Sequence, residues 1–302
     1  MDAISDLISI ANENKDGGPR LLPASGSPGL FDGLTLKRID EALASGLLGP
    51  SQVSLARNGH TALRKQYVRA FQYPGVDLPE ALDYGRVMKS VSDGYTLILY
   101  ACDQWLSDLG REMAALRARS GHPAIAVIFI TPASEVGLEI HEDPLDTFVF
   151  QLAGTKTWEV FDRPPGWMTK GYLPREQVGE ARLQATLSVG DALYIPRGCP
   201  HVARADSLSM HLSIGIGTLT VRALLTALMG RRDLLPLEFD RAIPFATQSG
   251  APLGDLLRQA VDALVGRLGS QSWPDVLDQV VGPRPPVWEP GALERLSFEE
   301  AE

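Results

Sequence analysis

The sequence predicts a mainly β fold of the sandwich or jelly-roll type, with helices before and after the β part. Short apolar or alternating segments begin near Pro123, and each is bounded by Gly, Pro or Asp. Turn signals every 8–15 residues or so are typical of antiparallel β folds rather than of a sheet built from strand–helix–strand units. The predicted strands are 95–100, 125–131, 147–152, 156–161, 183–187, 192–195 and 209–216.

Helical spacing of apolar residues occurs on both sides of this β stretch, which suggests three parts. We expect an N-terminal segment and linker at 1–35, a central domain at 36–220 and a helical region at 221–302. Gly, Pro and Ser are frequent from Gly17 to Gly33, so this part is predicted to be a loop. The stretch 71–86 contains two prolines and is expected to wrap over the surface. The predicted helices are 2–12, 36–46, 103–119, 221–228, 256–268 and 273–281.

Composition limits the classes of partner. The chain has 302 residues, 44% of them hydrophobic and 22% charged, which is ordinary for a globular protein. Its net charge of −9 argues against nucleic-acid binding, since phosphate recognition usually needs a basic surface. No apolar run is long enough to cross a membrane, and no signal peptide is recognisable. The two cysteines, Cys102 and Cys199, are isolated, so we expect a cytoplasmic protein.

Three residues form a candidate metal site. His141 and Asp143 make a His-x-Asp motif, and His201 lies 60 residues further on. In an extended strand residues i and i+2 point to the same face, so His141 and Asp143 could share one ion. Two histidines and one carboxylate leave three positions open, which suits Fe(II). The motif alone is weak, because a solvent-facing turn would explain it equally well.

The sequence around these residues resembles the JmjC-type, cupin-fold protein hydroxylases, notably the ribosomal-oxygenase group. The likeness rests on TPASEVGLEIHEDPLDTFVFQLAGTKTWEVFD (131–162) and GDALYIPRGCPH (190–201), and it extends over about residues 36–220. It implies a double-stranded β-helix core. It also implies that His141, Asp143 and His201 bind Fe(II), and that the protein uses 2-oxoglutarate and O2 to hydroxylate a protein or peptide side chain, with succinate and CO2 as co-products.

In the resembled group, a basic residue fifteen positions after the first metal histidine binds the far carboxylate of 2-oxoglutarate. Lys156 stands at that position, and an ammonium facing a carboxylate makes a charge-assisted contact. The hydroxyls of Thr131 and Thr147 could also contact this carboxylate, although strand threonines are usually there to pack. The group's helices after the barrel serve dimerisation, so the resemblance implies a homodimer.

Some positions depart from the group's pattern. Its usual Asn-x-Tyr appears here as Val127 and Phe129, and a polar residue late in the strand after the distal histidine appears as Gly215. These changes remove hydrogen bonds that could hold cosubstrate or substrate. Two alternatives therefore remain open: a metal-binding cupin of another reaction type, and a non-catalytic JmjC-like interaction module. His211 could line the pocket or could be a hydrogen-bonded core histidine.

Overall fold

The computed structural model describes residues 3–13, 17–22, 31, 33–73, 76–133, 135–164, 171–218, 220, 222, 225–226, 229 and 251–269. The chain divides into two compact units. The first contains all described residues up to Thr218, and the second contains those from Thr220 to Gly269.

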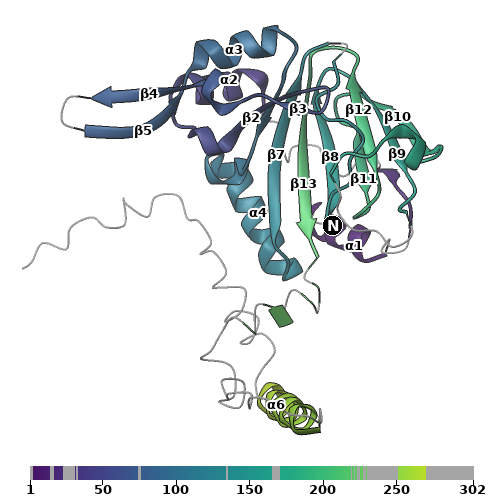
Figure 1. Cartoon of the computed structure of the whole chain (residues 1–302). Helices are drawn as coiled ribbons and strands as arrows, with labels where there is room; N and C mark the ends of the chain where they lie inside the picture. The colour runs from purple at the N-terminus through teal and green to yellow at the C-terminus, as the bar shows by residue number, and fades with distance from the viewer. Residues whose placement is uncertain are drawn as a thin grey trace, which may run out of the picture. The chain divides into compact units, whose positions relative to one another are not determined.

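The first unit is built on two antiparallel sheets that form the predicted β core (Figure 1). The larger sheet has eight strands in the order β1-β11-β8-β13-β7-β6-β2-β3, and the smaller sheet has the order β10-β9-β12. A separate two-stranded sheet pairs β4 (Val68–Tyr73) with β5 (Val76–Leu82). The strands of the larger sheet are β1 (Arg20–Leu22), β2 (Val53–Arg57), β3 (His60–Thr61), β6 (Thr96–Leu99), β7 (Ala124–Thr131), β8 (Leu145–Ala153), β11 (Ala192–Ile195) and β13 (Ser209–Gly217). Those of the smaller sheet are β9 (Lys156–Phe161), β10 (Ala181–Leu187) and β12 (His201–Ala205).

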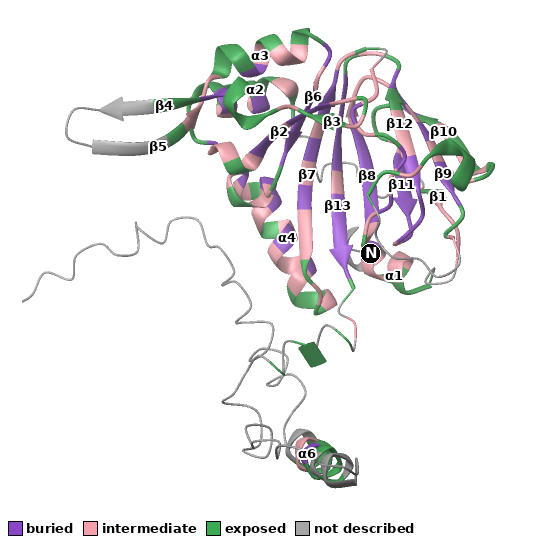
Figure 2. Ribbon diagram, viewed as in Figure 1, coloured by how far each residue is buried: buried purple, intermediate pink, exposed green. Residues whose placement is uncertain are grey.

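Most residues in the middle of β8 and β13 are buried, whereas buried and half-buried residues alternate along β7 (Figure 2). Along β7, Ala126 and Ile128 belong to the main hydrophobic core, whereas Val127 and Phe129 face a cavity. This alternation follows from the two-residue period of a strand. The antiparallel register sets His211 opposite Phe129. One face of the central strands therefore stabilises the fold, and the other is available to a ligand.

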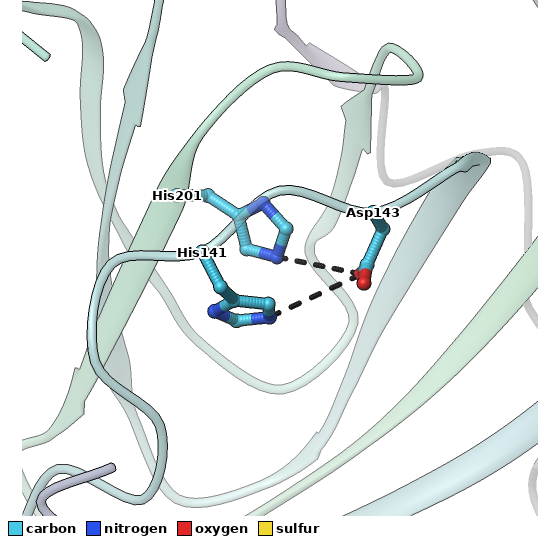
Figure 3. Close-up of side chains that lie close together, drawn as sticks. All are labelled: His141, Asp143 and His201. Atoms are coloured by element: carbon cyan, nitrogen blue, oxygen red, sulfur yellow. Dashed lines mark ion pairs between the residues drawn. The ribbon is translucent and has the colours of Figure 1, made fainter. Parts of the chain in front are cut away.

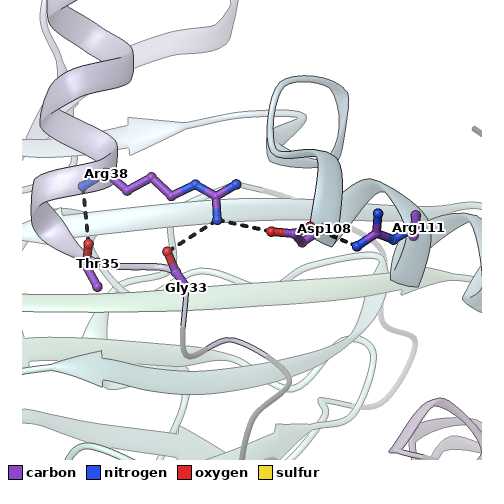
Figure 4. A network of polar contacts seen from close by, with 5 residues as sticks. All are labelled: Gly33, Thr35, Arg38, Asp108 and Arg111. Atoms are coloured by element: carbon purple, nitrogen blue, oxygen red, sulfur yellow. Dashed lines mark hydrogen bonds and ion pairs between the residues drawn. The ribbon is translucent and has the colours of Figure 1, made fainter. Parts of the chain in front are cut away.

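Among the described residues of the first unit, the α-helices that accompany the sheets are α1 (Ala3–Glu13), α2 (Leu36–Ala44), α3 (Tyr84–Ser92) and α4 (Ser107–Ser120). The Thr35 hydroxyl caps α2 by accepting from the backbone of Arg38. The Arg38 guanidinium then donates to the Gly33 carbonyl and to Asp108 of α4, which Arg111 also contacts (Figure 4). This network joins the start of α2 to the first turn of α4.

The structure differs from the sequence-based expectations in the less regular segments. Part of the expected linker at 17–33 forms β1, which pairs with β11 at the edge of the larger sheet. The expected surface wrap at 71–86 contains most of the β4–β5 hairpin and the start of α3. Strand β12, which begins at His201, was not predicted.

In the second unit, the described residues within 221–228 are helical, and α6 (Ala251–Gly269) confirms the helix predicted at 256–268. The helix predicted at 273–281 lies outside the described residues. Within the described part of the chain, every helix is too short or too polar to cross a membrane.

Candidate active site

The three predicted metal ligands lie together where the two sheets meet (Figure 3). Their ligand atoms all lie within 4.8 Å of one another. The Asp143 Oδ2 atom is 4.0 Å from His141 Nε2 and 3.7 Å from His201 Nε2. This spacing lets two imidazole nitrogens and one carboxylate oxygen converge on a single ion.

Backbone hydrogen bonds between separate segments bring these ligands together, whereas the sequence predicted that His141 and Asp143 lie on one extended strand. His141 and Asp143 precede β8 instead of lying on a regular strand. The backbone N–H of His141 donates to the carbonyl of His201 at 3.1 Å, and the N–H of His201 donates back at 2.8 Å. Gly198 N–H donates to the carbonyl of Asp143 at 2.9 Å. Backbone hydrogen bonds thus fix the relative positions of the three ligands.

Both histidines are held in the tautomer that metal binding requires. His141 Nδ1 lies 2.8 Å from the carbonyl oxygen of Glu139, and His201 Nδ1 lies 3.1 Å from that of Cys199. A carbonyl can only accept, so each Nδ1 carries a proton, and in the neutral imidazole Nε2 is then the atom with the lone pair. Burial and the adjacent His141 lower the pKa of His201 well below its usual value. A neutral imidazole is the form that binds a metal ion.

The second predicted feature is a buried lysine. Lys156, at the start of β9, is 4% exposed, and its ammonium donates to the Thr131 hydroxyl at 3.0 Å. The Thr96 hydroxyl also lies 3.1 Å from that of Thr131. Among the described residues, no carboxylate forms an ion pair with Lys156. Burial alone lowers the pKa of Lys156 to about 7.

One cavity of about 280 Å³ contains both features. It is lined by the three metal-ligand candidates together with Lys156 and Thr147. Thr131 does not line it, although its hydroxyl contacts the ammonium that does. The cavity thus has a metal end at His141, Asp143 and His201 and a lysine end at Lys156.

The positions that depart from the family pattern form an apolar wall of this cavity. Val127, Phe129 and Gly215 all line it. A Cβ atom on Gly215 would lie 2.6 Å from Leu145 Cδ1, so the leucine side chain occupies the space that a larger residue would need. The wall therefore offers apolar contact where the family pattern has polar groups.

Three further lining residues carry polar atoms, and of these only His211 was considered from the sequence. His211 is buried, stacks on Phe129 with ring centroids 4.8 Å apart, and has no hydrogen-bond partner for Nδ1 among the described residues. Burial, Lys156 and His201 lower its pKa, so its imidazole is neutral. Trp158 lies edge-on to His211, and Tyr100 is partly exposed. His211 is thus both a pocket residue and a packed core histidine.

The segment that carries this site is similar to a known domain family, and the fold is similar to that of solved structures. Residues 110–224 match the JmjC domain family. The chain is 27% identical over 168 residues to the bifunctional lysine-specific demethylase and histidyl-hydroxylase NO66 of Drosophila grimshawi, a match that covers 52% of this chain and 23% of that protein. It is 30% identical over 178 residues to ribosomal oxygenase 1 of Rattus norvegicus, covering 52% of this chain and 30% of the relative. The matches thus span less than a third of the length of these two curated relatives.

Solved structures of an Escherichia coli protein share the fold. The X-ray structure of E. coli ycfD matches with a TM-score of 0.55 and 20% identity, over 91% of this chain and 70% of that one. The structure of the ribosomal oxygenase YcfD in complex with cobalt and 2-oxoglutarate matches with a TM-score of 0.53 and 20% identity, over 91% and 69% of the two chains. These likenesses confirm the predicted jelly-roll architecture.

Proposed function

We propose that this protein is an Fe(II)- and 2-oxoglutarate-dependent oxygenase that hydroxylates a protein or peptide side chain. One observation carries the proposal: the same cavity contains three converging metal-ligand atoms and a buried lysine that has no carboxylate partner among the described residues. A ligand that satisfies both ends needs one group that binds a metal ion and an anionic group at its other end. 2-Oxoglutarate has both, as an oxoacid and a distal carboxylate.

The residues present fit the metal ion. His141, Asp143 and His201 would hold it through two neutral nitrogens and one carboxylate oxygen, a set that suits Fe(II) and leaves sites free for an oxoacid and O2. Bound there, the iron, cosubstrate and O2 supply the oxidation of a C–H bond, with succinate and CO2 as co-products. The carbonyls of Glu139 and Cys199 orient the two imidazoles through their Nδ1 protons.

The chain's own residues position the cosubstrate. The Lys156 ammonium would bind the distal carboxylate, with the Thr131 hydroxyl keeping Nζ in place. Thr147 lies in the same cavity and could donate its hydroxyl. The apolar wall that includes Val127, Phe129 and Leu145 excludes water from the reacting centre. Substrate would approach from the metal end, since Asp143 is the most exposed of the three ligands.

The relatives support this proposal. E. coli YcfD is described as a ribosomal oxygenase and has been solved with cobalt and 2-oxoglutarate. NO66 is named as a lysine-specific demethylase and histidyl-hydroxylase, and the Rattus norvegicus relative is named ribosomal oxygenase 1. A protein or peptide substrate is accordingly the class we propose here. Homodimer formation through the region 221–302 stays a prediction.

Two alternative functions would use the same site differently. A metal-binding cupin of another reaction type would not need Lys156, whose burial without an anion is hard to explain unless a ligand provides one. A non-catalytic interaction module would not need three converging ligand atoms. The oxygenase accounts for both ends of the cavity.

The test is turnover of 2-oxoglutarate. We expect the wild-type protein with Fe(II) to release succinate from 2-oxoglutarate even without substrate, and Asp143→Ala to lose at least 100-fold of this activity, because metal affinity falls. The matched control is Asp262→Ala, at an exposed position of α6 that is not a metal ligand. Succinate release that is absent from the wild type, or equal in Asp143→Ala, would refute the proposal. Mass spectrometry for a +16 Da product then identifies the substrate.

A further inference from the structure

The tip of the β2–β3 hairpin contacts the segment that leads to the first metal ligand. Asn58 and Gly59 both have positive φ, 49° and 74°, which is the geometry of a tight two-residue turn. Their backbone N–H groups donate outward, Asn58 to the carbonyl of Val136 at 2.8 Å and Gly59 to that of Gly137 at 3.1 Å. The turn therefore binds the backbone of residues 136–137.

The side chain that precedes the turn makes a second set of contacts. Arg57 donates to both carboxylate oxygens of Glu135, from Nε at 3.2 Å and from Nη2 at 2.9 Å. Its Nη1 donates to the carbonyl of Asp93 at 2.7 Å. Isolated exposed ion pairs contribute little, but a two-bond pair that is also tied to the backbone fixes direction as well as distance. Arg57 thus holds Glu135 at the end of β2.

The same segment is held from its other side by the smaller sheet. Ala205 N–H donates to the carbonyl of Glu135 at 3.1 Å, and Val136 forms an isolated bridge with Arg204 of β12. Residues 135–137 therefore join the hairpin tip to the strand that begins with His201. Two residues further on, the carbonyl of Glu139 accepts from His141 Nδ1.

Two glycines allow neighbouring turns to pack closely on this segment. A Cβ atom on Gly59 would lie 2.6 Å from Glu139 Cγ, and one on Gly94 would lie 2.6 Å from Glu135 Oε1. Both glycines also have positive φ, which larger residues rarely adopt. Only glycine at these two positions lets the hairpin and the turn before β6 pack directly on the segment.

We propose that Arg57, Glu135 and the Asn58-Gly59 turn form a clamp that positions the Glu139 carbonyl and, through it, the His141 imidazole. Arg57 and Glu135 are positioning residues and touch neither metal nor cosubstrate. This inference rests on the proposed function, because it assigns the clamp to the metal site of that function. The clamp also holds Gly137, which lines the cavity and packs on Thr96.

The first measurement is amide hydrogen exchange of the metal-free protein. We expect Arg57→Ala to speed exchange of the amides in 135–141 by roughly tenfold, because the segment opens locally more often. The matched control is Arg64→Ala, which breaks the ion pair between Arg64 and Glu80 of β5, 3.0 Å long and more exposed. Unchanged exchange at 135–141 in Arg57→Ala would overturn the clamp whether or not the protein binds metal.

The second measurement is Mn(II) affinity by calorimetry. We expect roughly tenfold weaker binding for Arg57→Ala, in the range seen when partners of metal ligands are removed. Arg57→Lys, which lacks the planar fork of the guanidinium, should fall between, and the exchanged pair Arg57→Glu with Glu135→Arg should recover part of the loss. If the role of Arg57 is only structural, Arg57→Ala lowers the melting temperature but leaves Mn(II) affinity unchanged at a temperature where the variant is folded. That result would overturn the inference. A wild type that binds no Mn(II) would instead remove the proposed function and the clamp's role in it.

Discussion

The two ends of the cavity are built in opposite ways. At the metal end, each imidazole is oriented by a backbone carbonyl, and Asp143 is 39% exposed at its side chain. At the lysine end, Lys156 is 4% exposed and its nitrogen contacts a threonine hydroxyl. The metal end is thus set by backbone geometry, whereas the lysine end depends on one buried side chain that lacks a counter-charge among the described residues.

The two ends of the cavity therefore favour different groups on a ligand. The metal end can exist as neutral imidazoles and a hydrated carboxylate, so it costs the folded protein little. Burying an ammonium without an anion is unfavourable, which is why the pKa of Lys156 falls to about 7. The lysine end gains most from an anionic ligand, and substitutions there should separate stability from binding.

The largest expected effect comes from Lys156→Met, which keeps the length of the side chain and removes its nitrogen. We expect 2-oxoglutarate affinity, measured by calorimetry with Mn(II), to fall at least 100-fold, since charge-assisted contacts are strong. We also expect the free energy of unfolding of the ligand-free protein to rise by about 1–3 kcal/mol, because the substitution removes a buried ammonium that lacks a counter-charge among the described residues. If Lys156→Met is less stable than the wild type and binds 2-oxoglutarate equally well, our account of the lysine end is wrong.

A pH dependence should follow from the same lysine. In the ligand-free protein its pKa is about 7, and a bound carboxylate would raise it. Affinity for 2-oxoglutarate should therefore be highest below pH 7 and weaken as the pH rises, by up to about tenfold per unit, until the pH passes the bound-state pKa. Calorimetry between pH 6.5 and 9 (roughly the window set by these pKa values) checks this. Lys156→Arg, if it binds, should show a nearly flat profile, because arginine stays charged.

The smallest effect is expected from Thr131→Val, which replaces the hydroxyl that accepts from Lys156 with a methyl group of similar size. Loss of one hydrogen bond predicts weaker 2-oxoglutarate binding by roughly three- to tenfold. Thr186→Val, on the outer face of β10, is the control and should leave affinity unchanged. Equal affinity in both variants would show that Thr131 packs without helping to position Lys156.

The sequence identified the ends of the cavity better than its walls. His141, Asp143, His201 and Lys156 were selected because the segments around them resemble a known family, and the central strands because their apolar periodicity is regular. Strand β12 was missed because its five residues include an arginine and follow a Pro-rich turn. β1 was missed because three residues between Gly- and Pro-rich stretches give no periodic signal.

The contacts that join distant segments could not be read from the sequence at all. The ion pair between Arg57 and Glu135 links positions far apart in the chain, and neither residue belongs to a motif. An Asn-Gly pair favours a tight turn, but nothing in Asn58-Gly59 indicates that its N–H groups reach the carbonyls of Val136 and Gly137. Such contacts depend on the register of the whole sheet, which local patterns do not fix.

The backbone bonds between His141 and His201 also bear on how the protein matures. They join residues 60 positions apart, so the metal site forms only after a large loop has closed and both sheets are in place. An ion that binds this site binds the finished fold and not its precursors. At a free concentration 100 times its Kd, such an ion would raise the free energy of unfolding by about 2.7 kcal/mol and so lower the unfolded population. Metal supply would then govern how long each molecule escapes proteolysis, in addition to how fast it turns over.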